Sequence, residues 1–361
     1  MNEKLKPLIS TFVAILLGLL VGFIIILIAN PSQAVKAFSI LLRGGFYRGL
    51  KSTGQVLYYC VPIMMTGCAV AFAFKCGNFN IGVVGQFTVG AFASIFTVNM
   101  LYGIVPTSIL WIVGLLASGI AGALWGLIPG LLKAFRNVNI VISGIMFNYM
   151  GMYLVIQGVK TFIYDSKGAC SQVAKVAIPK MGLNKIFSGS DINGSTIIAI
   201  LVCILVWIVL NKSTFGYELK ASGYNPDASK YAGMSEKRIV VLAVVVSGFL
   251  AGLGGGLASL SGTGKTLSTT EALLDDGFNG IPVALLGMNS PLGCIISSMF
   301  IAWLNVGGNY MQSCNVAVEF IDVIIASIIY FSSFALIVKS LLDKYDLKKL
   351  KKSEDKGGEE S

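Results

Sequence analysis

The stretch from Ser259 to Thr269, "SLSGTGKTLST", has residues whose types and spacing could bind a nucleotide. Its Gly-Lys-Thr triplet at 264–266 looks like the end of a phosphate-binding loop, in which backbone N–H groups and a lysine hold the phosphates. The full pattern also needs a glycine five positions before the triplet, where this chain has Ser259. Such a loop follows a strand, whereas an apolar run of helical length, 239–260, precedes this one. We therefore expect no ATP site here.

Other reactive residue types are scarce. The chain has no histidine, which excludes histidine acid–base catalysis and histidine–metal sites. None of its seven cysteines forms a C-x-x-C pair, and most lie in apolar runs, so we interpret them as small packing residues. A disulfide between Cys170 and Cys314, both in predicted outer loops, is the alternative. The sequence thus predicts a protein without cofactor, metal or enzymatic activity of its own.

The composition predicts an all-α integral membrane protein. Hydrophobic residues make up 55% of the chain and charged residues 12%, against roughly 25% charged in a soluble domain. The net charge of +10 does not indicate nucleic acid, because the basic residues lie in short segments between apolar runs, where they orient helices in membrane lipid. The first apolar run, 8–29, is longer than the roughly 7–15 residues of a secretory h-region, so we expect an uncleaved first span.

Charge-free windows locate the spans, each of which needs about 20 apolar residues. They predict ten transmembrane helices in one polytopic domain, residues 1–342, followed by a polar, disordered cytoplasmic tail, residues 343–361. The windows are 7–35, 52–74, 76–132 with two spans broken near 99–106, 137–159, 192–211, 239–264, 277–318 with two spans, one of them short, and 323–338.

The basic residues predict the orientation. With the N-terminus inside, 17 of the 27 Lys and Arg residues lie in inner segments, so we expect both termini in the cytoplasm of a multi-pass protein of the cell membrane. The remaining basic residues lie mainly in two long outer segments, 31–54 and 160–193, which weigh less as their length grows. Segment 31–54 could form an amphipathic helix on the outer surface.

Two stretches are too polar and glycine-rich for plain spans: "KCGNFNIGVVGQ", 75–86, and "GFNGIPVALLG", 277–287. Irregular backbone at membrane depth is tolerated where it is buried in protein or lines a cavity. The stretches follow spans two and seven, which are an odd number apart, so the halves face opposite ways. This predicts broken helices within an inverted repeat of spans 2–5 and 7–10. The alternative is that the glycines only let helices pack closely.

The cytoplasmic loop 212–238 contains signals for a short helix. Asn225 can cap it, Pro226 suits its first position, and Asp227 favours the positive end of the helix dipole. Gly233 can end it as the residue after the cap. A helix of about two turns is too short to be stable alone in water, so it needs the neighbouring spans or a partner. An ordinary capped connector is the alternative.

This loop, "ASGYNPDASKYAGMSEKRI", resembles the coupling-helix loop of permease subunits of ATP-binding-cassette (ABC) importers, in the branch for simple sugars, nucleosides and branched-chain amino acids. "FKCGNFNIGVVGQFTVGAFAS" and "GFNGIPVALLGMNSPLG" resemble two signature segments of that branch. The wording is most similar to nucleoside permeases that work with a basic-membrane-protein-type lipoprotein, over residues 55–339. Cys76 and Tyr224 depart from the pattern, where a small and an acidic residue are usual; the second could alter the charge match to the ATPase.

The resemblance implies that the loop docks on a separate ABC ATPase subunit through Gly223, Asn225, Pro226, Asp227, Ala228, Tyr231, Ala232 and Gly233. It also implies a second permease, related or identical, and an extracellular substrate-binding lipoprotein. An ion-coupled secondary transporter of a small polar solute is the alternative. Such carriers usually place ionisable groups inside the membrane, and this chain has none between Lys75 and Lys133, although unwound backbone carbonyls could bind sodium.

Amides and phenylalanines of the broken stretches and spans could line a pathway for a neutral small-molecule solute, with the rings stacking on a base or a sugar face. Each could instead join helices within the protein. An uncharged lining favours a nucleoside, then a simple sugar, then a branched-chain amino acid. The candidates are Asn78, Phe79, Asn80, Gln86, Asn148, Phe278, Asn279, Asn305 and Asn309.

Overall fold

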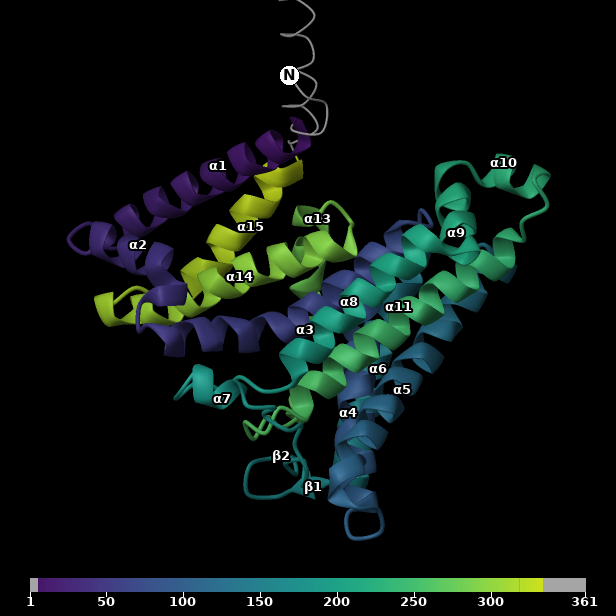
Figure 1. The fold of residues 1–361 in the computed structure, drawn as a ribbon, viewed down its shortest axis with the longest axis horizontal. Helices are drawn as coiled ribbons and strands as arrows, with labels where there is room; N and C mark the ends of the chain where they lie inside the picture. Colours follow the sequence, from purple (N-terminus) through teal and green to yellow (C-terminus); the bar gives the residue numbers. More distant parts are fainter. Residues whose placement is uncertain (1–5, 318, 334–361) are drawn as a thin grey trace, which may run out of the picture. The chain divides into compact units, whose positions relative to one another are not determined.

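The computed structural model describes residues 6–317 and 319–333, and this part of the chain is mostly helical. It divides into two units: the larger holds residues 48–303, and the smaller joins residues 1–47 to the chain from 304 onward. Each unit is described by itself below (Figure 1). The tail predicted at 343–361 lies outside the described residues.

Eight helices of the described chain are long and apolar enough to cross a membrane, which confirms an all-α integral membrane protein. They correspond to eight of the ten predicted segments. They are α1 (Lys6–Ala29), α3 (Leu50–Phe74), α4 (Val83–Leu101), α5 (Thr107–Arg136), α6 (Ile140–Phe162), α8 (Ser195–Lys212), α11 (Glu236–Ser259) and α14 (Pro291–Met311).

The other two predicted segments are shorter helices. The short span expected within 277–318 is α13 (Gly280–Leu286), whose seven residues cannot cross a bilayer. The last span is α15 (Glu319–Ser333), for which the structure describes 15 residues. The inverted repeat of spans 2–5 and 7–10 stays a prediction.

Helices α4, α5 and α11 form the centre of the larger unit and lie side by side (Figure 1). Glycines let their backbones touch. A Cβ atom on Gly252 of α11 would lie against the Ser118 carbonyl of α5 and 3.0 Å from the Gly122 Cα atom. A Cβ atom on Gly90 of α4 would in turn meet the Gly252 backbone. No side chain separates these helices, which is the close packing that small residues permit in membranes.

Helices α4, α5 and α6 begin or end at positions that the local sequence predicts. The break predicted near 99–106 falls between the end of α4 and the start of α5. Helix α5 ends at Asn137, which adopts the left-handed conformation with φ 52°. Asn139 then caps α6, because its side chain accepts a hydrogen bond from the Val141 N–H at 2.9 Å.

The long segment after α6 covers the end of α11. It contains an antiparallel hairpin of two short strands, β1 (Tyr164–Asp165) and β2 (Cys170–Ser171), followed by α7 (Leu183–Ile186). The Ser171 N–H donates to the Leu267 carbonyl at 2.8 Å, and the Ile178 N–H donates to the Leu260 carbonyl at 2.8 Å. These bonds fix residues 260–274, the non-helical stretch that follows α11, which we call the strap.

The smaller unit packs α1 against α15, with Gly18 and Gly22 facing Ile328 and Ile324. The helix predicted within 31–54 is present as α2 (Ala34–Arg43), and a 3₁₀ turn, Gly44–Phe46, follows it. Residues 304–311 of α14 and a second 3₁₀ turn, Gln312–Cys314, complete the unit. All seven cysteines of the chain are free thiols, including Cys170 and Cys314.

Candidate functional site

The first broken stretch joins α3 to α4 and is held by buried amides. Asn80 donates to the Gln86 side-chain oxygen at 3.0 Å and to the Ser247 hydroxyl at 2.9 Å, and its own oxygen accepts from the Gly82 N–H at 3.0 Å. Ser247 of α11 donates onward to the Ala69 carbonyl of α3 at 2.7 Å. Asn80 therefore ties the break to helices on both sides.

Asn148 of α6 also forms hydrogen bonds to backbone groups of this first broken stretch. Its oxygen accepts from the Gly85 N–H at 2.8 Å, and its NH₂ group donates to the Ile81 carbonyl at 3.1 Å. Asn80, Gln86 and Asn148 are each only 1% exposed. Asn80 and Asn148 replace helical partners that the broken backbone lacks, and such replacement is what permits irregular backbone at membrane depth. The buried Gln86 NH₂ group has no hydrogen-bond partner among the described residues.

We expect Asn148→Leu to lower stability by about 2 kcal/mol or more, because the change leaves two buried backbone groups unpaired at about 1–3 kcal/mol each. Thermal unfolding of the purified protein in detergent measures the effect. Asn211→Leu is the matched control, since Asn211 is exposed at the end of α8. Equal midpoints for the two variants would show that Asn148 does not hold the break.

The second broken stretch packs directly on the first. It consists of α12 (Asp275–Phe278) and α13, which has seven residues. A Cβ atom on Gly277 would lie 2.8 Å from the Val84 Cα atom, and Gly280 lies against Thr66 of α3. The two stretches, about 200 residues apart in sequence, therefore meet beside α3 and α4.

The remaining candidate residues are less deeply placed. Asn78 is buried and donates to the Cys76 carbonyl at 3.3 Å, while Phe79 is half-buried against the edge of the Phe74 ring. Phe278 is 39% exposed and Asn279 is half-buried in the second stretch. Asn305 and Asn309 belong to the smaller unit, where Asn305 is half-buried and Asn309 exposed. The structure thus brings together Asn80, Gln86 and Asn148.

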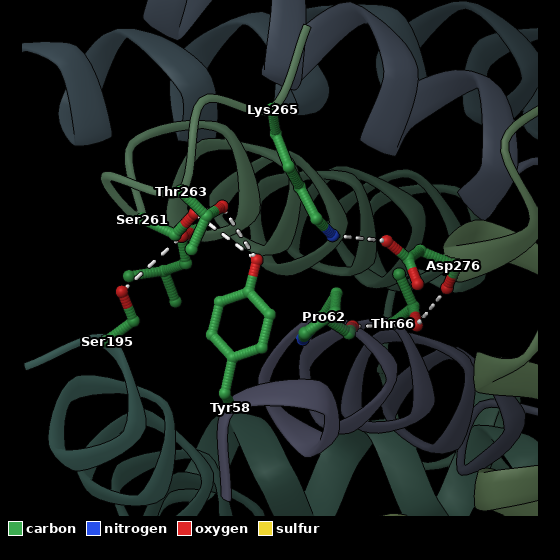
Figure 2. Close-up of polar contacts among 9 residues, drawn as sticks. Tyr58, Pro62, Thr66, Ser195, Ser261, Thr263, Lys265 and Asp276 are labelled. Carbon is green, nitrogen blue, oxygen red and sulfur yellow. Dashed lines mark hydrogen bonds and ion pairs between the residues drawn. The ribbon is translucent and has the colours of Figure 1, made fainter. Parts of the chain in front are cut away.

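The nucleotide-like stretch, which lies in the strap, contacts both α3 and α12 through its side chains (Figure 2). The Lys265 ammonium lies 3.3 Å from the Asp276 carboxylate and 5.7 Å from the centre of the Tyr58 ring. The Tyr58 hydroxyl shares a hydrogen bond with the Thr263 hydroxyl at 2.9 Å. Thr66 donates to the Asp276 carbonyl at 3.1 Å. The strap and α12 are both held on α3 by these bonds.

The electrostatics of Lys265 agree with this role. Burial, the largest single influence, lowers the pKa of Lys265, but the Asp276 carboxylate together with Tyr58 and Tyr59 outweighs burial, so that the pKa is raised above its ordinary value. The stretch follows α11 and is itself non-helical, whereas a phosphate-binding loop lies between a strand and a helix. The sequence analysis expected no ATP site here and missed Tyr58, Thr66 and Asp276, whose only signal was their polarity beside apolar runs.

The short helix predicted in the loop 212–238 is confirmed as α10 (Pro226–Tyr231), which follows α9 (Thr214–Tyr224). The Asn225 side chain accepts from the Ala228 N–H at 3.0 Å. At the other end, the Gly233 N–H bonds the Lys230 carbonyl at 3.0 Å and the Met234 N–H bonds the Ser229 carbonyl at 3.1 Å. Gly233 has φ 83°, so a Schellman motif ends the helix.

Most residues of α10 are exposed. Tyr224 before the helix and Tyr231 at its end are 90% and 94% exposed, and Ser229 is the only buried residue of α10. Helix α9, in contrast, is seated on the protein. A Cβ atom on Gly223 would lie 3.0 Å from the Cys76 carbonyl carbon and from the Gly77 N atom. The loop therefore rests on the turn that opens the first broken stretch.

The sequence of the chain matches the model of a known protein family over most of its length. The family model described as "Branched-chain amino acid transport system / permease component" matches residues 52–333. The chain belongs to this family of transport permeases.

Three individual relatives are similar to this chain over two thirds of its length or more. The chain is 36% identical to the guanosine ABC transporter permease protein NupP of Bacillus subtilis, over 95% of this chain and 98% of NupP. It is 32% identical to the nucleoside ABC transporter permease protein NupB of Lactococcus lactis, over the whole of both chains. A second guanosine permease protein of B. subtilis, NupQ, is 30% identical over 68% of this chain and 77% of NupQ. No solved structure matches the chain.

The fold and the family together define the class of protein. This chain is the multi-pass membrane permease subunit of an ABC importer, a class of subunit that is not itself an enzyme. The ion-coupled carrier, the alternative raised by the sequence, is not favoured.

Proposed function

We propose that this subunit carries nucleosides across the cell membrane, with both termini in the cytoplasm, and that a separate ATPase drives it through the α9–α10 loop. The observation that carries the proposal is the placement of this loop: its exposed helix is free to bind a partner, and Gly223 rests on the first broken stretch. A push on α10 thus has a direct contact route to the backbone break. The positive-inside bias supports the orientation.

Within the loop, Tyr224 and Tyr231 are the natural anchors for the ATPase, because exposed tyrosines are enriched among residues that dominate protein interfaces. Asn225, Pro226, Asp227 and Ala228 shape the helix, and Ala232 and Gly233 end it. These roles support the docking function inferred for Gly223, Asn225, Pro226, Asp227, Ala228, Tyr231, Ala232 and Gly233.

In the pathway, the candidate residues divide by burial. Asn78, Asn80, Gln86 and Asn148 are buried, so we assign them to holding the break in position. Phe79, Phe278 and Asn279 retain exposed surface in the larger unit, so we assign them to the pathway lining. Asn305, half-buried in the smaller unit, stays a candidate by itself. The assignment rests on burial, since a residue that meets a passing solute must reach open space.

We also propose that a second, related permease completes the pore and that an extracellular lipoprotein delivers the solute. Support for a related second chain comes from B. subtilis, where two guanosine permease proteins are each similar to this chain. The nucleoside is favoured because NupP and NupB, which match nearly the whole chain, are named for guanosine and nucleosides.

The test is uptake by the reconstituted transporter with its ATPase, second permease and lipoprotein. We expect ATP-dependent accumulation of labelled guanosine or uridine, and much slower accumulation of ribose and leucine. An ATPase lacking its catalytic glutamate is the control and should abolish uptake. Uptake of leucine that nucleosides do not compete would refute the nucleoside assignment, and uptake driven by an ion gradient without ATP would refute the coupling.

A further inference from the structure

The exposed faces of two spanning helices of the larger unit are aliphatic. On α5 the exposed large residues from 109 to 131 are Ile109, Ile112, Leu116, Ile120, Leu124, Ile128 and Leu131. On α8 they are Ile197, Leu201, Ile204, Leu205 and Ile208. Such faces suit lipid tails, because they present no polar group that would need a partner.

The exposed face of α6 is mixed: polar groups stand among apolar residues such as Ile142, Met146, Met150 and Leu154. Tyr149 and Tyr153 are 50% and 51% exposed, and Gln157 is exposed as well. Their spacing of four residues places all three on one side of the helix. Tyr153 is nine residues from the end of α6, or about 14 Å at 1.5 Å per residue. This is well inside the hydrocarbon region, away from the interfacial belts where tyrosine usually lies.

A carboxylate reaches this face. The Tyr153 hydroxyl donates to Glu271 at 3.1 Å. Glu271 is exposed and belongs to the strap, which is fixed by Leu267 and Lys265 on one side and continues into α12. The strap therefore descends beside α6 instead of staying at the outer surface. An ionisable group at such a depth is costly in lipid and faces the protein interior or a water-filled cavity.

We propose that the α6 face of Tyr149, Tyr153 and Gln157, together with Glu271, is a wall of the water-filled translocation pathway, and that Glu271 is a specificity-determining residue. Its carboxylate only accepts hydrogen bonds, so it selects a solute rich in N–H and O–H donors. The tyrosine rings offer faces on which a planar base stacks. An uncharged nucleoside has both features, whereas the carboxylate repels a phosphate group.

The nucleoside part of this inference rests on the proposed function, but the wall itself does not. Two alternatives predict a dry face: contact with lipid, and burial against the second permease. Thiol accessibility separates the wall from both. Cys170→Ser supplies the background, because the other six cysteines are buried.

In this background, Tyr153→Cys and Gln157→Cys are compared with Leu205→Cys, which is 60% exposed on the aliphatic face of α8. The probe is a cationic, membrane-impermeant methanethiosulfonate applied to the assembled transporter in membranes. We expect positions 153 and 157 to react at least about 10-fold faster than position 205, since only a thiol in water ionises and reacts readily. Equal rates at the three positions would overturn the proposed wall.

Glu271→Gln tests the specificity role while keeping the size of the side chain and an acceptor for Tyr153. We expect nucleoside uptake to fall about 10-fold, because charge-assisted hydrogen bonds are roughly twice as strong as neutral ones. Nucleoside protection of Gln157→Cys from the reagent should be lost as well. Asp191→Asn, an exposed carboxylate of the outer segment, is the matched control and should change neither.

Uptake and protection that are both unchanged in Glu271→Gln would overturn the role of Glu271. If the wild-type transporter carries another solute and no nucleoside, the proposed function fails, and the labelling contrast still decides whether α6 borders the pathway. The two failures are therefore distinguishable.

Discussion

Gly252→Ala is expected to destabilise the permease strongly, although alanine is the better helix former. The added Cβ atom would lie against the Ser118 carbonyl and 3.0 Å from the Gly122 Cα atom, and both are backbone atoms that cannot rotate away. Helices α5 and α11 must then separate, at about 1–3 kcal/mol for an overpacked core. Gly252→Val should prevent assembly altogether. The yield of monodisperse protein in detergent and its thermal midpoint measure both effects.

Gly130→Ala is the matched control on α5. A Cβ atom there would first meet a side chain at 3.4 Å, an ordinary contact. The same substitution should therefore be neutral or stabilising by up to about 1 kcal/mol, from helix propensity. Equal midpoints for the two alanine variants would show that backbone contact between α11 and its neighbours does not limit stability.

Gly233→Val is expected to uncouple transport from ATP hydrolysis. Gly233 has φ 83° and open space around its Cα atom, so the obstacle is the backbone conformation and not a clash. A left-handed residue with a side chain costs roughly 1–2 kcal/mol, and more when it is β-branched. A two-turn helix has little stability from which to absorb that cost. We expect ATP-driven uptake to fall about 10-fold, with ATP hydrolysis and membrane insertion retained.

Gly233→Asn separates conformation from side-chain size, because asparagine tolerates the left-handed region. It should retain most of the uptake. If the valine variant transports at the wild-type rate, α10 is not the element that transmits motion from the ATPase. If the asparagine variant fails as badly as valine, the surface around Gly233 matters more than its backbone.

Local chemistry explains what could be predicted from the sequence. The ends of α10 follow from Asn225, Pro226 and Gly233, whose effects act within a few residues. The backbone breaks follow from glycine and asparagine in otherwise apolar runs. The sequence did not predict the length of α13, because the charge-free window 277–318 of 42 residues does not show that the helix before Gly287 has only seven residues.

Long-range contacts explain what could not be predicted. Asn80 forms a hydrogen bond with Ser247, which is 167 residues away, and neither local sequence indicates that the two residues meet. The strap reads as an outer connector because it is polar, yet bonds from Ser171 and Lys265 hold it and Tyr153 meets its Glu271. Its course is set by partners on three other segments, so Glu271 was not among the predicted pathway residues.

The glycine contacts among α4, α5 and α11 have a mechanical consequence for the transport cycle. Backbones in direct contact have no side-chain layer that could change rotamer and let them slide, so these three helices must travel as one rigid body. Hinges then belong to non-helical links that leave this body, such as residues 232–235 between α10 and α11. Distances measured between labels on α4 and α11 should stay constant through the cycle, while distances from either helix to the exposed α10 change.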